Sequence, residues 1–210
     1  MIFSARLFRV FLLPATFAIF LSIAVITCPR GAFAQETVVM FDPAHTQVDM
    51  TLDATLHTVH GAFKLKSGEI HFDPQTGKAQ GAIVIDAASG NTGDDSRDKK
   101  MHEQVLESAK YPEITFVPEQ VKGSIPAKGT AQIPVSGVIR IHGQEHPLFF
   151  MVSADAPSGG QIHVKAEFSI PYKEWGMKDP SNFLLRVSDT VKIEIDAVAR
   201  LGALSAAATP

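Results

Sequence analysis

The chain has 210 residues, a formal net charge of −3 and one cysteine. This length fits a single domain, and one cysteine excludes a disulfide within the chain. The acidic balance argues against a nucleic-acid partner, because a negatively charged protein surface repels the phosphate backbone.

The first residues have the composition of an export signal. Arg6 and Arg9 form a basic start, residues 11–27 are almost wholly apolar, and Ala32-Phe33-Ala34 gives the small-x-small pattern that a signal peptidase accepts. We therefore expect a signal peptide over residues 1–34. An uncleaved membrane anchor is an alternative, since the apolar run approaches the length of a spanning helix.

Cleavage after Ala34 would leave 16 basic and 22 acidic residues, a net charge of −6, and a mature chain without cysteine. Such a chain would be stabilised by burial of apolar surface and would keep no membrane span. A lipid attached to Cys28 is a further alternative for the leader. We expect one domain over residues 35–200, followed by a flexible tail over residues 201–210.

Most of the remaining sequence alternates apolar and polar residues. In residues 47–56, Val48, Met50 and Leu52 fall on one face and polar residues fall on the other. Alternation of this kind is typical of a strand with one buried side and one solvent-facing side. Further alternating segments are residues 37–41, 63–65, 70–72, 81–85, 114–116, 133–141, 148–154, 162–170 and 191–197.

Turn and helix signals separate these segments. Ser67-Gly68 and residues 73–77 are rich in turn-forming residues, so we expect a turn at each. Met101 and Val105 are four residues apart within residues 99–107, as on one face of a short helix. Many short strands at hairpin spacing predict an all-β fold, either an antiparallel sandwich or an eight-stranded barrel, with one short helix inserted between strands.

The predicted inward faces mix bulky residues such as Phe150 with small ones such as Gly81, Gly137 and Ala154, and they carry no charged residue. Small inward residues leave space lined by carbon, so a ligand held there would be long and apolar. The alternative is that these residues only let the strands bend and that the core is full. An outer-membrane barrel is disfavoured, because the chain lacks the aromatic girdles of that class.

Metal and catalytic motifs are weak in this sequence. His57 and His60 fall on opposite faces of a strand and no spacing completes a four-ligand set, so we expect no metal and no cofactor. No Gly-x-Ser-x-Gly elbow or phosphate-binding loop occurs. We interpret the polar cluster of Asp94, Asp95, Arg97 and Asp98 as capping and salt bridging at a helix start, with Asp98 at the positive end of the helix. A lid hinge or a site for a ligand head group is the alternative for this cluster. A secreted enzyme or stress-response factor that uses Arg97, Asp98 and His102 is the alternative function.

Several blocks of the sequence resemble the YceI-like family of lipid- or polyisoprenoid-binding proteins. The most specific block is Tyr111-Pro112-Glu113-Ile114-Thr115-Phe116. The other blocks are Phe41-Asp42-Pro43-Ala44-His45-Thr46, Gly61-Ala62-Phe63, Gly68-Glu69-Ile70-His71-Phe72-Asp73-Pro74, Arg97-Asp98-Lys99-Lys100-Met101-His102 and residues 137–147. Residues 171–180, which contain Trp175, depart from the family pattern.

The resemblance implies a lipocalin-like barrel with an interior channel. It also implies a periplasmic or secreted carrier that binds an apolar isoprenoid or quinone-type lipid without catalysis. The sequence leaves open whether the protein forms a homodimer. We expect inward-facing side chains to bind this ligand, with Trp175 at the channel mouth. The candidate ligand-binding residues are Leu52, Leu56, Phe63, Phe72, Ile85, Met101, Phe116, Ile139, Phe150, Ala154, Phe168 and Trp175.

Overall fold

The structure is a computed structural model that describes residues 36–158, 160–181 and 186–202. The expected signal peptide lies outside the described residues, as does the expected tail from residue 203 onward. The last strand runs through Gly202, so the first two residues assigned to the tail from the sequence belong to the sheet.

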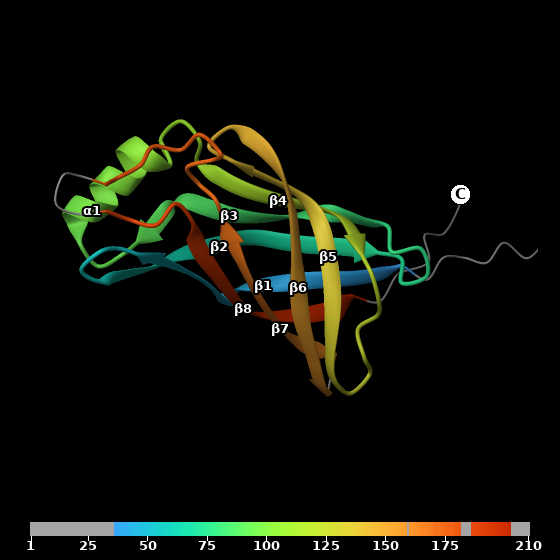
Figure 1. Cartoon of the computed structure of the whole chain (residues 1–210). Coiled ribbons are helices and arrows are strands. Elements are labelled where there is room, and N and C mark those ends of the chain that lie inside the picture. Colours follow the sequence, from blue (N-terminus) through green and yellow to red (C-terminus); the bar gives the residue numbers. More distant parts are fainter. Residues whose placement is uncertain (1–35, 159, 182–185, 203–210) are drawn as a thin grey trace, which may run out of the picture. The chain divides into compact units, whose positions relative to one another are not determined.

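Eight strands form one closed antiparallel barrel (Figure 1). Each strand pairs with the next in sequence, and the last pairs with the first. The prediction of an all-β, eight-stranded barrel with one short helical insertion is therefore confirmed. The strands are β1 (Thr37–Asp53), β2 (Thr58–Phe72), β3 (Ala79–Asn91), β4 (Glu113–Val121), β5 (Gly129–Ile141), β6 (Gln144–Ser158), β7 (Gln161–Ile170) and β8 (Val191–Gly202).

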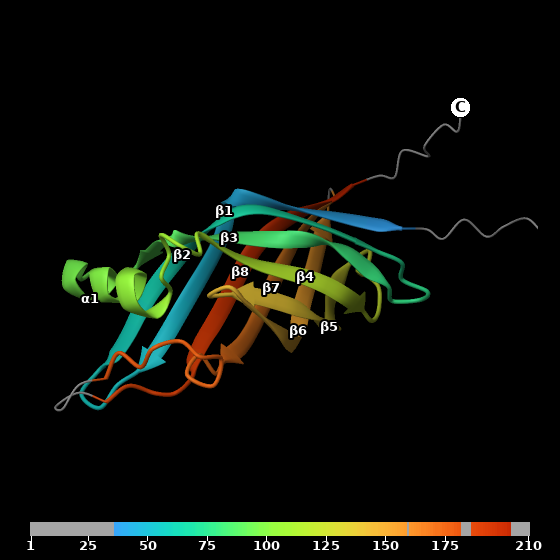
Figure 2. The ribbon, with the colours of Figure 1, turned by 90° about the horizontal axis from the view of Figure 1, so that it is seen from above.

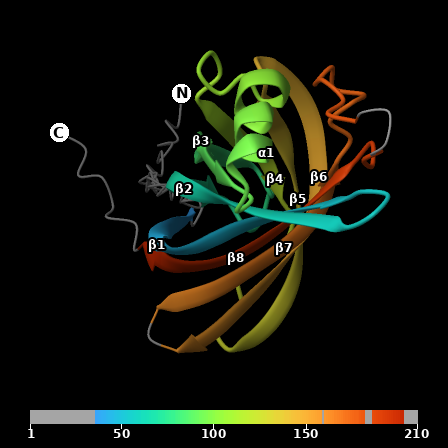
Figure 3. The same cartoon turned by 90° about the vertical axis from the view of Figure 1, so that its left-hand side faces the viewer.

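A short helical segment joins β3 and β4. Helix α1 spans Asp95–Lys100 and continues as one π-helical turn, η1, over Met101–Val105. It lies at one end of the barrel together with the β1–β2 turn and the segment that follows β7 (Figures 1 and 2). Figure 3 views the ring of strands from this end, which we call the α1 end.

Strand β1 joins two segments that the sequence predicted separately. Its pairing with β8 shifts between Phe41↔Ala199 and Thr46↔Ala197, so extra β1 residues bulge out of the ladder. The bulge is fastened locally: the carboxylate of Asp42 accepts from the Ala44 N–H at 2.9 Å, and the Thr46 hydroxyl donates to the Asp42 carbonyl at 2.8 Å. The bulge changes which residues face inward, because it displaces the alternation along the strand.

The predicted turn at Ser67-Gly68 is wrong, because β2 runs straight through it. Pairing with β3 passes from Leu65↔Ile85 to Ser67↔Val84, which leaves Lys66 as the extra residue of a bulge. A bulge and a turn both favour small and polar residues, so the local sequence signal is the same for the two.

The two glycines that the sequence placed on inward faces do not leave space inside the barrel, contrary to the expectation, and Gly81 is exposed. A Cβ at Gly137 would lie 2.2 Å from the Val117 carbonyl oxygen of the neighbouring strand. Gly81 has a φ of +106°, and a Cβ there would lie 2.2 Å from the Glu69 carbonyl oxygen. Both glycines therefore allow close approach of two backbones, which a side chain would prevent.

Candidate ligand-binding site

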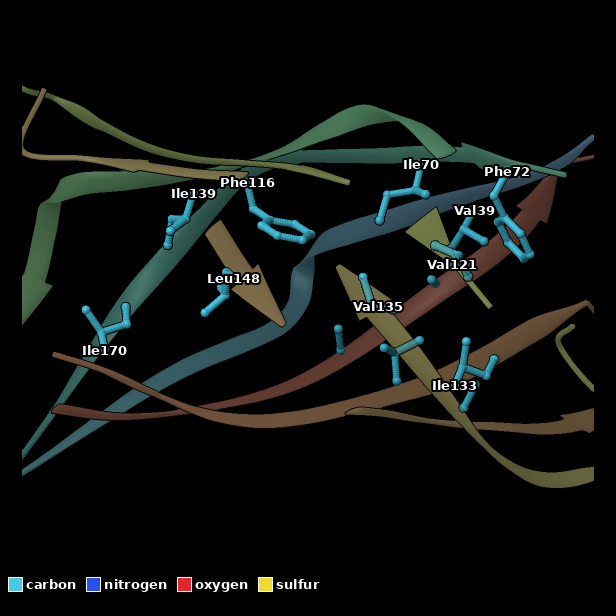
Figure 4. Packing of buried hydrophobic residues seen from close by; sticks show 14 of the residues in the cluster. Val39, Ile70, Phe72, Phe116, Val121, Ile133, Val135, Ile139, Leu148 and Ile170 are labelled. Carbon is cyan, nitrogen blue, oxygen red and sulfur yellow. The ribbon is translucent and has the colours of Figure 1, made fainter. Parts of the chain in front are cut away.

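The barrel encloses a cavity of about 500 Å³. This volume lies within the range of roughly 300–1,000 Å³ that is typical of small-molecule sites. All eight strands contribute side chains to its lining, and most of these are aliphatic or aromatic. Figure 4 shows such side chains, among them Phe116, Ile139 and Leu148, within the interior.

The small residues that open this cavity are alanines. Ala154 on β6 is 2% exposed and Ala166 on β7 is 9% exposed, and both line the cavity. Next to them, Phe150 packs between Phe116 and Phe168, with ring centroids 5.3 Å and 4.8 Å away. The interior thus contains a packed group of three phenylalanine rings, and unfilled space lies beside it at the two alanines.

All candidate binding residues except Leu56 and Trp175 line this one cavity. The side chains that the structure brings together there are Leu52, Phe63, Phe72, Ile85, Met101, Phe116, Ile139, Phe150, Ala154 and Phe168. Met101 and Val105 both reach it from η1, as their spacing predicted.

Leu56 and Trp175 are not among the residues that line the cavity. Leu56 is 78% exposed in the turn after β1, because β1 ends at Asp53 and the alternation has no strand to carry it further. Trp175 stacks on His146 with the ring centroids 4.2 Å apart and the planes 3° from parallel. It packs at the α1 end without lining the cavity.

Sequence reasoning missed two cavity residues of the same irregular segment. Tyr172 and Met177 are each 4% exposed and line the cavity. A tight turn holds them, in which the Met177 N–H donates to the Tyr172 carbonyl at 3.0 Å. The only sequence signal was the presence of large apolar side chains in a segment without alternation.

Among the residues that the structure describes, polar side chains line the cavity at the α1 end alone. They come from the β1–β2 turn, the start of α1 and the segment after β7. The lining residues of this mouth that carry polar groups are His57, Thr92, Asp94, Ser96, Arg97, Lys100 and Tyr172. A ligand in the cavity would therefore meet carbon along its length and polar groups at one end.

The polar cluster around α1 fastens the chain that enters the helix. Arg97 donates from Nε to the Thr92 hydroxyl at 2.7 Å and from Nη2 to the Thr92 carbonyl at 2.9 Å. The buried Asp98 carboxylate accepts from the Thr92 N–H at 2.9 Å and from its hydroxyl at 2.5 Å. The helix cap is Asp94, which accepts from the Arg97 N–H at 2.9 Å, and Asp98 lies in the first turn, as the sequence predicted.

His102 is also held by structural hydrogen bonds. Its Nε2 lies 2.8 Å from the Gly90 carbonyl oxygen and must donate to it, which leaves Nδ1 to accept from the Ser108 hydroxyl at 3.1 Å. Among the described residues, no group of three or more histidine, cysteine, aspartate or glutamate side chains could hold a metal ion.

The segment after β7 is tied to the rest of the α1 end. The Lys100 ammonium donates to the Pro180 carbonyl at 2.5 Å, and the Tyr172 hydroxyl donates to the Ser188 carbonyl at 2.9 Å. Lys173 pairs with Asp179 at 2.8 Å, and this hydrogen bond lowers the pKa of Asp179 to about 2. Burial raises the pKa of Tyr172 to about 12.

Residues 40–199 match the YceI-like domain. The chain belongs to the YceI-like family. Two relatives from curated sequences are UPF0312 proteins. That of Vibrio cholerae is 28% identical over 145 residues, which are 66% of this chain and 75% of the relative. That of Pseudomonas savastanoi pv. phaseolicola is 27% identical over 159 residues, which are 71% of this chain and 80% of the relative.

Solved structures share the fold of this YceI-like chain. A polyisoprenoid binding domain from Saccharophagus degradans, implicated in plant cell wall breakdown, has a TM-score of 0.64 at 19% identity, covering 78% of this chain and 98% of that one. BcnA of Burkholderia cenocepacia has a TM-score of 0.61 at 22% identity, and the match covers 75% of this chain and 98% of BcnA. In the part of the YceI-like chain that the structure describes, no helix is long and apolar enough to cross a membrane.

Replacement of Asp98 tests the structural role of the α1 cluster in this YceI-like chain. Asp98→Ala should lower the free energy of unfolding by about 1–3 kcal/mol, because two Thr92 donors lose a charged acceptor. Urea denaturation measures the change. Asp95→Ala is the matched control, since Asp95 is exposed in the same turn and should change stability by less than about 0.5 kcal/mol. Equal effects of the two substitutions would contradict this role.

The pH dependence of Tyr172 tests its burial. Folding favours the protonated phenol, so its contribution to stability is fully present below the ordinary pKa of 10.0 and is lost as the pH rises through about 12. Ultraviolet absorbance titration should show one tyrosine ionising near pH 12, and Tyr172→Phe should remove that transition. Ionisation of Tyr172 near 10.0 would show that the side chain is accessible to solvent.

Proposed function

We propose that this chain is an exported, non-catalytic carrier that holds a long apolar lipid of the isoprenoid or quinone type inside its barrel. The observation that carries the proposal is the cavity of about 500 Å³, lined by carbon except at the α1 end. A charged or strongly polar ligand would lose its hydration there without gaining hydrogen-bond partners, whereas an apolar chain would have no hydrogen bonds with water to lose. A polar head group would find donors and acceptors only at the mouth.

Two further observations support the proposal. One similar structure is that of a polyisoprenoid binding domain, so the same fold is compatible with such a ligand. The sequence of residues 1–34 supports export to the periplasm or out of the cell. The enzymatic alternative has less support, because Arg97, Asp98 and His102 direct their polar atoms to Thr92, Gly90 and Ser108.

Filling the cavity tests the carrier function. Ala154→Phe places a ring where Ala154 lines the cavity, so we expect the affinity for farnesol to fall by about tenfold or more, which corresponds to about 1.4 kcal/mol. The melting temperature should hold or rise, because the added ring fills empty space. Binding is measured by displacement of Nile red from the full chain.

Ala62→Phe is the matched control, because Ala62 is exposed on β2 and its ring would not enter the barrel. It should leave farnesol binding unchanged. The proposal fails if the wild type binds neither farnesol nor Nile red and Ala154→Phe costs about 1–3 kcal/mol of stability, as overpacking of a full core would.

A further inference from the structure

The barrel wall has a seam between β1 and β2. Their ladder pairs stop at Met40↔Glu69 and resume at Val48↔Phe63, so residues 41–47 lie opposite residues 64–68 without a ladder pair. Elsewhere around a barrel, backbone hydrogen bonds between neighbouring strands close the wall. At this seam, side chains have to close it.

Phe41 is the side chain that closes the seam. It lines the interior cavity, and it also lines a groove on the outer surface together with Met40, Pro43 and Gly68. A Cβ at Gly68 would lie 3.1 Å from both Cβ and Cδ2 of Phe41, so the absence of a side chain at position 68 gives the ring its place. Phe41, which is half-buried, is thus shared by the linings of the cavity and of the outer groove.

The outer groove has an apolar character at this point. Gly81 and Ala82 extend it beyond Met40 and Pro43, and Met40 is 43% exposed. The charged residues of the groove have partners: Lys66 Nζ lies 2.5 Å from Glu113 Oε1, and His71 Nε2 lies 2.6 Å from Glu69 Oε1. The groove is therefore mixed, with Met40, Pro43 and Ala82 as apolar surface and with paired charges beside them.

The backbone next to Phe41 is held by contacts that do not involve the ring. Asp42 accepts from the Ala44 N–H and from the Thr46 hydroxyl, so a change of the Phe41 rotamer would not have to break these hydrogen bonds. No ladder hydrogen bond with β2 has to break, because none spans residues 41–47.

We propose that Phe41 is the partition that sets ligand length and that the groove is a second subsite for the end of an apolar chain. A ligand that fits the cavity leaves the ring in place. A longer chain displaces the ring, leaves the barrel through the seam and lies along Met40, Pro43 and Ser67. This proposal rests on the carrier function, because it assumes an apolar ligand in the cavity.

A single thiol in the groove tests the exit of the ligand. In the full chain with Cys28→Ser, the exposed Ser67 is replaced by cysteine and its labelling by a maleimide is followed with farnesol or with the much longer solanesol. Solanesol should slow the labelling several-fold and farnesol should not. Ser169→Cys, on the exposed face of β7, is the control thiol and should label at one rate throughout.

Removal of the ring tests the partition. Phe41→Ala should raise the affinity for solanesol relative to farnesol by about tenfold, the factor that burial of about two further CH₂ groups supplies. Phe149→Ala, at a phenylalanine that is 66% exposed on the barrel exterior, should leave the ratio unchanged.

The outcomes separate the two proposals. Suppose that farnesol and solanesol both bind and that the Ser67→Cys thiol is labelled at the same rate in each complex. This result would overturn the second subsite and leave the carrier function standing. Binding of neither ligand to the wild type would overturn both. Protection of the thiol by solanesol alone supports the subsite even where Phe41→Ala does not fold.

Discussion

Closure of the sheet is the constraint on which the rest of the molecule depends. Because β8 pairs with β1, the wall has no free edge, and inward side chains can pack only against one another. Eight strands fix the width of the interior, and Ala154 and Ala166 are too small to fill it beside the group of phenylalanines around Phe150. Apolar cavities of this kind do not hold water well, which favours an apolar occupant.

The polar motif residues hold the ends and irregularities of this barrel. Asp42 fastens the β1 bulge, whereas Arg97 and Asp98 fasten the entry to α1 through Thr92. The Asp42 bulge lies beside Phe41, and the Thr92 contacts lie beside the polar mouth of the cavity.

The sequence predicted the regular strands because their alternation is uninterrupted, as in β5, β7 and β8. It failed at the bulges, where Ser67-Gly68 resembles a turn and where the Asp42 segment separates two halves of one strand. Alternation shows which side chains of a strand share one face, so it predicted most of the side chains that line the cavity. It does not give the point at which a strand ends, and Leu56 was misplaced for that reason.

The segment after β7 could not be placed from sequence at all. Its position depends on contacts with distant parts of the chain, such as the bridge between Ala54 and Val187 and the hydrogen bond from the Thr55 hydroxyl to the Arg186 carbonyl. The sequence therefore predicted Trp175 as a ligand-binding residue at the channel mouth and overlooked Tyr172, which lines the cavity.

Identification of what the cavity holds in the cell tests directly whether the protein carries a lipid. The full chain is purified from its native envelope without detergent exchange, extracted with organic solvent and studied by mass spectrometry of the extract and of the intact complex. We expect one long apolar lipid in stoichiometric amount with the protein. Intact protein of unchanged mass, with no lipid in the extract and no uptake of added isoprenoid, would contradict it.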